Sequence, residues 1–251
     1  MIIIAVANQK GGTGKTTTAI NLAAGLFRAG KKVLLIDMDP QSSLTEYFFD
    51  PANVTATIYN ALIDGATVAP LVIGEQIHLI PATIDLAAAE IQLPGKRNQE
   101  RSLSRFLRPL MDQYDYCLID CPPSLGVLTT NALTAAHLIL VPVSTELMAE
   151  RTVKLILNTV EEIKEVELNP NLRVWRILAT LYDQRLAHHR EILMALRTKY
   201  SDLLYPEPVI ATTKYKDAVT SSTDISDLAP KLGEFWDKLA TTLIGETQEA
   251  Q

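Results

Sequence analysis

Short apolar runs alternate with amphipathic segments along most of the chain. The apolar runs lie at Ile2–Ala7, Val33–Ile36, Ile77–Ile80, Tyr116–Ile119, Leu138–Val143 and Ile177–Leu181. Helix-like spacing of apolar residues is found at Thr16–Ala29, Ile84–Gln92, Arg101–Gln113, Glu146–Val166 and Arg190–Tyr200. Apolar runs of this length are typical of strands buried on both faces, and strands separated by helices are usually parallel. The pattern therefore predicts an α/β fold, with a mostly parallel twisted sheet and helices on both faces.

Length and composition favour one domain over residues 1–251, with a flexible acidic tail from about residue 246. No apolar run approaches the ~18–20 residues of a membrane span. The opening run, Met1–Ala7, lacks basic residues and predicts a buried strand rather than a secretory signal. Cys117 and Cys121 would lie about 13 Å apart along a strand, too far for a disulfide. Two reduced thiols predict a cytoplasmic protein.

The net charge of −6 argues against a chain that binds nucleic acid over its whole surface. Residues 171–216 differ, because they hold eight Lys/Arg against four Asp/Glu, a net charge of +4 that leaves −10 for the remainder. We expect any DNA contact there, and the alternative is a set of solvated helix faces. The candidate DNA-binding residues are Arg185, Arg190, Arg197, Lys214 and Lys216. His188 and His189 are expected to be surface or phosphate contacts, since no further metal ligand is visible nearby.

A glycine-rich stretch follows the first apolar run and precedes the first helical segment. Gln9–Thr17 reads QKGGTGKTT, close to the G-x-x-x-x-G-K-[ST] phosphate loop but with Gln9 for the first glycine and an additional Lys10. Glycines let backbone N–H groups converge on an anion, and a helix N-terminus adds its dipole. Lys15 would contact the β- and γ-phosphates, and Thr16 would ligate Mg²⁺. The residues predicted to hold the nucleotide are Gly11, Gly12, Thr13, Gly14, Lys15, Thr16 and Thr17.

Two further apolar runs end in acidic residues. Val33–Ile36 is followed by Asp37 and Asp39, and Tyr116–Ile119 is followed by Asp120. An Asp-Pro pair at residues 39–40 also favours a turn, so each acid alone is weak evidence. Ligands of parallel sheets lie at the carboxyl ends of strands, where one carboxylate can orient an attacking water and another can hold the Mg²⁺ shell. These acids therefore predict the remainder of a Mg-nucleotide site.

The stretch from Lys10 to Thr17 resembles the deviant Walker A motif of the ParA/MinD ATPases, which are SIMIBI-class P-loop NTPases. Val33–Gln41 resembles the second motif of that family. Ile80–Ala87 and Tyr114–Leu125 are most similar to the ParA (Soj) partition branch. The resemblance implies an ATPase that requires ATP and Mg²⁺. Val209–Ala218 departs from the family pattern, so no adenine contact is assigned.

The resemblance also implies roles for single residues. Lys15 would bind the β/γ-phosphates and Thr17 the α-phosphate, while Lys10 would reach the nucleotide of a partner copy and act in catalysis there. A lysine offered in trans stabilises transition-state charge as an arginine finger does.

The three acids would act together on the other side of the phosphates. Asp39 would position the attacking water, Asp120 would hold Mg²⁺ through water, and Asp37 would support the same metal shell. Lys10, Lys15 and Asp39 are thus the predicted catalytic residues, and Thr16, Asp37 and Asp120 the predicted metal site.

A partition ATPase of this family implies an ATP-dependent sandwich dimer that binds DNA non-specifically and is nucleoid-associated. Hydrolysis would be stimulated by a centromere-binding or adaptor protein. One alternative is a MinD-like membrane-positioning ATPase, which would use the amphipathic stretch Leu228–Ile244. Its lysines, Lys231 and Lys238, are matched by Glu234 and Asp237, so core packing is the better interpretation. A metabolic ATP-dependent ligase of the same fold, such as dethiobiotin synthetase, is the third alternative.

Overall fold

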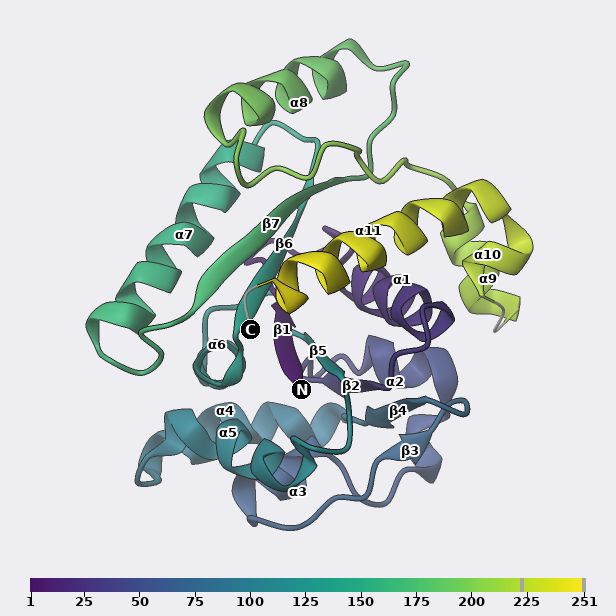
Figure 1. Cartoon of the computed structure of the whole chain (residues 1–251). Coiled ribbons are helices and arrows are strands. Elements are labelled where there is room, and N and C mark those ends of the chain that lie inside the picture. The colour runs from purple at the N-terminus through teal and green to yellow at the C-terminus, as the bar shows by residue number, and fades with distance from the viewer. Residues whose placement is uncertain (222–223, 250–251) are drawn as a thin grey trace.

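The computed structural model describes residues 1–221 and 224–249, and within them the chain forms one seven-stranded sheet covered by helices (Figure 1). The strand order is β3-β4-β2-β5-β1-β6-β7, and only the β3–β4 pair is antiparallel. The strands are β1 (Ile2–Val6), β2 (Val33–Asp37), β3 (Leu71–Val72), β4 (Ile77–Ile80), β5 (Tyr116–Asp120), β6 (Leu138–Ser144) and β7 (Arg173–Thr180). The predicted fold class is confirmed.

The strand register brings the predicted site residues to one edge of the sheet. Strand β1 lies between β5 and β6, and Val6 at its end pairs with Asp120. On the other side of β5, Asp37 at the end of β2 also pairs with Asp120. The loop after β1 therefore leaves the sheet directly beside two strand-terminal acids.

Helices cover both faces of this sheet, and strand alternation decides which residues each layer contacts. Ile4 and Val6 of β1 join the core beneath α1 and α11, whereas Ile3 and Ala5 join the core beneath α5, α6 and α7. The helices are α1 (Lys15–Arg28), α2 (Ser43–Phe48), α3 (Ile58–Ile63), α4 (Ala89–Gln92), α5 (Ser102–Leu107), α6 (Val127–Ala135), α7 (Ala149–Glu165), α8 (Ala187–Lys199), α9 (Lys214–Ser221), α10 (Ile225–Leu228) and α11 (Pro230–Gln248).

Two predicted helices are interrupted. The Ile84–Gln92 segment begins as a 3₁₀ turn at Ile84–Ala88 and becomes α-helical only in α4. The Arg101–Gln113 segment is α-helical only to Leu107 and continues as the 3₁₀ turn Arg108–Leu110. Pro109 explains this end, because proline lacks the N–H that the next helical hydrogen bond requires.

The C-terminal helix is part of the core, which corrects the predicted flexible tail. Helix α11 runs to Gln248, and Glu246 accepts a hydrogen bond from Trp175 Nε1 at 2.7 Å and pairs with Arg176. Residues 250–251 lie outside the described part of the chain. Trp236, Leu239 and Leu243 of the amphipathic stretch are fully buried in the core that α11 shares with α1, as core packing predicts, and Leu232 and Phe235 are partly buried against it. Leu228, at the start of the stretch, is exposed. Among the described residues, no helix is both long and apolar enough to span a bilayer.

Candidate active site

The glycine-rich loop connects β1 to α1 in a shape that needs glycine at two positions. Gly12 and Gly14 have φ angles of +71° and +82°, in the left-handed region that residues with a Cβ disfavour. No protein atom lies within 4 Å of where a Cβ at either residue would point. Helix α1 begins at Lys15, and no side chain caps its N-terminus. Its first N–H groups therefore remain available for an anion.

Side chains from neighbouring strands hold this loop in place. Asn8 donates through Nδ2 to the carbonyl of Pro142 on β6 and accepts a hydrogen bond from the Lys10 N–H at 3.1 Å. The Thr180 hydroxyl, at the end of β7, donates to the carbonyl of Thr13 at 2.8 Å. The loop is thus fixed by contacts to strands that lie far from it in the sequence.

A cavity of about 730 Å³ opens in front of the loop. This volume lies within the ~300–1,000 Å³ range of small-molecule sites, which suits a nucleotide. The lining residues are Gly11, Gly12, Gly14, Lys15, Thr16, Thr17, Ile20, Asn21, Asp39, Gln41, Ser43, Glu46, Tyr47, Pro123, Leu181, Tyr215 and Ala218. The predicted phosphate-binding residues other than Thr13 therefore share one cavity with Asp39.

Asp120 is the residue most suited to a cation, although it does not itself line the cavity. It is 1% exposed, and neither of its carboxylate oxygens has a hydrogen-bonding partner among the described residues. Burial, followed by the nearby charge of Asp37, raises its pKa well above the ordinary value. The Thr16 hydroxyl and the Lys15 ammonium act in the opposite direction. Two buried, unpartnered oxygens beside a threonine hydroxyl match the oxygen donors that Mg²⁺ prefers.

Asp37 is also fully buried, but its oxygens are already engaged. Oδ2 accepts hydrogen bonds from the N–H and hydroxyl of Thr45, and Oδ1 accepts one from the N–H of Asp39. Burial raises the pKa of Asp37 to about 6 in spite of these bonds. Asp37 therefore anchors the start of α2 through Thr45, whereas neither oxygen of Asp120 has a hydrogen-bonding partner among the described residues.

Asp39 lies beyond the end of β2, at the wall of the cavity. One of its carboxylate oxygens accepts a hydrogen bond from the Gln41 N–H at 2.9 Å. It is half-buried, unlike Asp37, because the strand ends at Asp37 and the chain turns outward after it. Asp39 therefore lines the same space as the phosphate loop.

The two lysines of the loop lie in different environments. Lys15 is buried, lines the cavity, and places its ammonium 3.5 Å from the carbonyl oxygen of Lys10. Lys10 does not line the cavity; its ammonium forms an ion pair with Glu146 and lies 3.4 Å from the hydroxyl of Ser144. The Lys10 contact lowers the pKa of Glu146.

The cysteines and histidines also have defined positions. Cys117 and Cys121 are free and buried, and burial raises the pKa of both thiols, so neither is a reactive thiolate. His188 is exposed, but the expectation of a surface contact is wrong for His189. His189 is 8% exposed, and its Nδ1 accepts a hydrogen bond from the N–H of Asp183 at 3.0 Å. The described part of the chain holds no cluster of three or more His, Cys, Asp or Glu side chains arranged to bind a metal ion.

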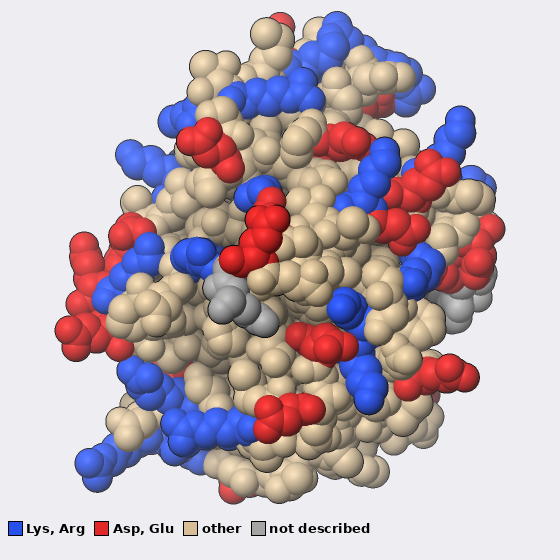
Figure 2. Space-filling model, viewed as in Figure 1, with Lys and Arg blue, Asp and Glu red and all other residues tan. Residues whose placement is uncertain are grey.

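The five candidate DNA-binding residues fall on two separate helices. Arg185 precedes α8, and Arg190 and Arg197 belong to it, whereas Lys214 and Lys216 lie on α9 beside the cavity (Figure 1). Lys and Arg side chains gather over α8 at the top of Figure 2. Four of the five already have partners within the chain. Arg185 pairs with Asp183 and Lys214 with Asp217, while Arg190 and Arg197 donate to the carbonyls of Gln184 and Pro206. The monomer therefore does not present them as one patch.

Several residues of the site were not predicted. Leu181, Tyr215 and Ala218 complete the cavity wall opposite α1, and Glu146 holds Lys10. Tyr215 belongs to no recognised motif, because it lies in the segment that departs from the family pattern. The only sequence signal that could have placed Tyr215 was the spacing of apolar residues in α9. That helix has 8 residues, too few for a helical period to be detected reliably.

This fold and this loop define a P-loop ATPase. A family model described as an AAA domain matches residues 1–174. The chain is 38% identical over 250 residues to the chromosome-partitioning ATPase Soj of Thermus thermophilus, covering 98% of this chain and 97% of the relative. It is 39% identical over 220 residues to the sporulation initiation inhibitor protein Soj of Bacillus subtilis, covering 86% and 87%.

A solved structure gives a further comparison. A Mycobacterium smegmatis protein described as cobyrinic acid a,c-diamide synthase, with bound ATP analogue and magnesium, aligns with a TM-score of 0.87 at 34% identity. The alignment covers 100% of this chain and 97% of that one. The chain belongs to the ParA/MinD family of ATPases and is similar to its Soj members.

Proposed function

We propose that this chain is a cargo-positioning ATPase in which ATP and Mg²⁺ close two copies into a sandwich dimer that binds DNA. The placement of Lys10 carries the proposal. Lys15 already occupies the phosphate cavity, whereas the Lys10 ammonium stands outside it at the rim, on a side chain that is 36% exposed. A second lysine in this position can neutralise phosphate charge only in a facing copy.

The surface around Lys10 is suited to a second copy of the chain. Leu147 and Met148 follow Glu146 directly and are 88% and 47% exposed, and Leu181 at the cavity wall is 41% exposed. Apolar side chains beside an open polar cavity are typical of a surface that becomes covered. A dimer through this surface would bury these residues and enclose both nucleotides.

The residues of one copy then divide the chemistry among themselves. The loop N–H groups, Lys15 and Thr17 would hold the phosphates, and Thr16 and Asp120 would hold Mg²⁺, which when bound supplies charge neutralisation for the phosphates. Asp39 accepts a hydrogen bond from the attacking water and orients it. Lys10 of the facing copy stabilises the charge that develops on the transferred phosphoryl group.

Light scattering tests the dimer. A non-hydrolysable ATP analogue with Mg²⁺ should double the molar mass of the wild-type chain, whereas ADP should leave it monomeric. A chain that stays monomeric under saturating analogue contradicts the proposal. The Lys15→Ala variant is the control: it should stay monomeric with the ATP analogue, because it lacks the lysine that binds the phosphates.

Non-specific DNA binding and a stimulating partner belong to the same proposal. Arg185, Arg190 and Arg197 would contact DNA phosphates weakly in a single chain. The dimer carries two such sets of arginines, so DNA binding would depend on ATP through avidity. Charge reversal at Arg190 and Arg197 together should weaken DNA binding and reduce its salt dependence, with ATP hydrolysis unchanged. Unchanged DNA binding would place the interface elsewhere. The partner is expected to be a centromere-binding or adaptor protein, and nucleoid association would follow from DNA binding.

An ATP-dependent amide-forming ligase is the second candidate, supported by the likeness to the Mycobacterium smegmatis protein. A ligase that draws ammonia from glutamine requires a reactive thiol, and the two cysteines here are buried with raised pKa. Stimulation of ATP turnover by DNA and not by a carboxylate substrate with ammonia would separate the two candidates. A MinD-like membrane role is disfavoured, because Trp236, Leu239 and Leu243 of α11 are fully buried.

A further inference from the structure

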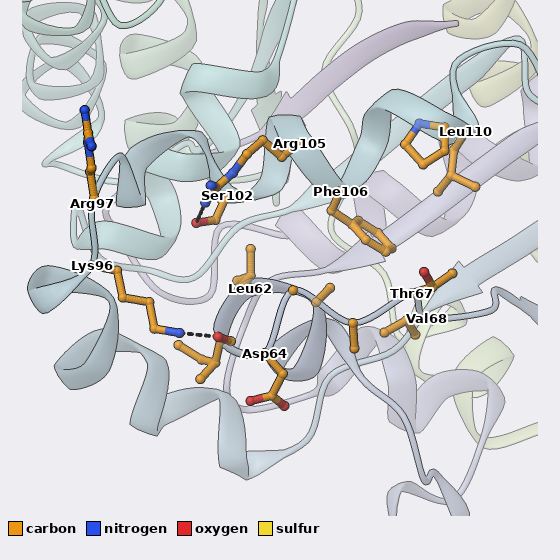
Figure 3. Close-up of a pocket in the computed structure, with 15 residues that line it drawn as sticks. Leu62, Asp64, Thr67, Val68, Lys96, Arg97, Ser102, Arg105, Phe106 and Leu110 are labelled. Atoms are coloured by element: carbon orange, nitrogen blue, oxygen red, sulfur yellow. Dashed lines mark hydrogen bonds between the residues drawn. The ribbon is translucent and has the colours of Figure 1, made fainter.

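A second pocket lies away from the nucleotide cavity, between α3, the turn after it, and α5. It has a volume of about 530 Å³ and belongs to the helical layer on the opposite side of the sheet from α1. Figure 3 shows Lys96 and Arg97 on one side of this pocket and Phe106 and Leu110 on the other, with Leu62 between them. Nothing in the proposed ATPase cycle uses it.

The pocket has an apolar floor. Leu62, Val68 and Leu110 are buried at its base, and Phe106 is half-buried and faces into it. Its volume would hold one or two large apolar side chains together with their backbone, within the ~300–1,000 Å³ range of small binding sites. A floor of this kind favours a ligand that carries a bulky apolar group.

The rim of the pocket is basic. Residues 96–108 contain five Lys/Arg against one Glu, a net charge of +4 outside the basic window predicted from the sequence. These side chains gather at the lower left of Figure 2, over α4 and α5. Lys96, Arg97 and Arg105 line the pocket itself, and Arg101 and Arg108 are exposed in the 3₁₀ turns on either side of α5.

Most of this charge has no acidic partner. Arg105 donates to the Ser102 hydroxyl at 3.0 Å, and Lys96 donates to the Ile63 carbonyl at the end of α3. The side chains of Arg97 and Arg108 make no hydrogen bond or ion pair with any residue that the structure describes. Asp64, the one carboxylate among the described lining residues, accepts a hydrogen bond from Asn60.

We propose that this pocket docks an acidic segment of a partner protein, with one large apolar side chain of the segment seated on Phe106 and Leu62. Acidic residues on either side of the apolar anchor would meet Arg97 and Arg105, which line the pocket. A DNA backbone fits less well, because phosphates would meet the arginines but offer nothing apolar to fill the pocket. The inference does not depend on the ATP cycle.

The test uses a library of fluorescein-labelled acidic nonapeptides, each with one Phe, Leu or Trp at the centre, titrated against the full chain. Binding should be saturable by fluorescence anisotropy and should weaken about tenfold when the central residue is serine. The double variant Arg97→Glu/Arg105→Glu should lose about tenfold or more, because opposite charges become like charges. Phe106→Ala should also weaken binding.

Controls separate docking from misfolding and from general charge. Lys231→Glu reverses an exposed charge on α11, in the other helical layer, and should bind peptide as the wild type does. Affinity for an ATP analogue should be unchanged in every variant, which reports an intact fold. No saturable binding by any peptide, equal binding by Arg97→Glu/Arg105→Glu, or binding of duplex DNA in place of the peptides would each overturn the proposal.

Discussion

The ammonium of Lys10 is held by the carboxylate of Glu146 in the same chain. Lys10 precedes the phosphate loop, and Glu146 lies just beyond the end of β6, so β6 and the loop after β1 bring them together. The ion pair leaves the Lys10 side chain directed away from its own phosphate cavity. If Lys10 acts on a facing copy, this contact must open before the dimer closes.

Glu146→Gln should therefore favour the ATP-bound dimer. The side chains of Lys10 and Glu146 are 36% and 53% exposed, so their ion pair stabilises the single chain by about 0.5 kcal/mol. Without the pair this energy need not be lost when the dimer forms, so dimerisation should tighten about twofold per chain. Analytical ultracentrifugation with an ATP analogue measures the change. Glu150→Gln is a matched control, because Glu150 forms a comparable exposed pair with Lys199 on α7 and α8. Weaker dimerisation in Glu146→Gln would instead assign Glu146 a role within the dimer.

Lys10→Ala and Lys15→Ala should separate two functions of the loop. Lys15 lines the cavity, so its loss should reduce ATP affinity by more than tenfold. Lys10 stands outside the cavity, so Lys10→Ala should bind ATP as the wild type does, yet hydrolyse it at least a hundredfold more slowly. Isothermal calorimetry and phosphate release give the two quantities. Equal loss of ATP affinity in both variants would mean that Lys10 acts on its own nucleotide.

The sequence predicted the strands and the phosphate loop well, because both depend on local patterns. Continuous apolar runs and the glycine spacing are short-range signals, and parallel topology then places Asp37 and Asp120 side by side. Helix α6 (Val127–Ala135) was missed, since it is nearly all apolar or small and has no amphipathic period to detect. Strand β7 begins at Arg173, four residues before the predicted apolar run, because its first part is partly exposed.

The sequence pattern could not predict contacts between residues that lie far apart in the chain. The pairing of Lys10 with Glu146 joins residues 136 positions apart. The five candidate DNA-binding residues were grouped by their closeness in sequence, but the chain separates them onto α8 and α9. The acidic end was taken as a tail because charge dominates it, whereas Arg176 and Trp175 on β7 supply partners that tie Glu246 to the sheet.

Asp120→Asn should stabilise the nucleotide-free chain while abolishing ATP hydrolysis. Folding raises the pKa of Asp120, so the fold favours its neutral form. Below the ordinary pKa of 3.8 the carboxyl is neutral in both the folded and the unfolded chain and costs nothing. Above 3.8 the unfolded chain loses this proton first, so the folded state loses stability as pH rises. At pH 8 the substitution should raise the free energy of unfolding by about 1 to 3 kcal/mol, since it removes a buried, unpaired charge beside Asp37.

The pH dependence provides the check on this variant. Asp37 adds a loss of stability between pH 3.8 and about 6, and it does so in both proteins. The difference between Asp120→Asn and wild type should therefore be smallest in acid and should grow toward pH 8. Urea unfolding at pH 5 and pH 8 measures it. A variant less stable than wild type at pH 8 would show that Asp120 is satisfied in the fold by a group other than a metal.

Gly25→Ala should destabilise the contact between α1 and α11. A Cβ at this position would lie 2.7 Å from the carbonyl oxygen of Trp236, which belongs to helix backbone and cannot easily move. We expect a loss of about 2 kcal/mol, or roughly 4 to 8 °C in melting temperature for a chain of this size. Gly245→Ala is the control, because nothing lies within 4 Å of its Cβ and a helical alanine should stabilise slightly. Equal melting temperatures would mean that the two helices can separate at little cost.

The Thr180 hydroxyl donates a hydrogen bond to the carbonyl of Thr13, and this contact affects how the phosphate loop binds a nucleotide. Together with Asn8 it ties the phosphate loop to β6 and β7, so contacts within the protein restrain the loop. Little conformational entropy is then lost on ATP binding, so the binding energy is not consumed in ordering the loop. In the proposed dimer, that energy can instead stabilise the contact between the two chains.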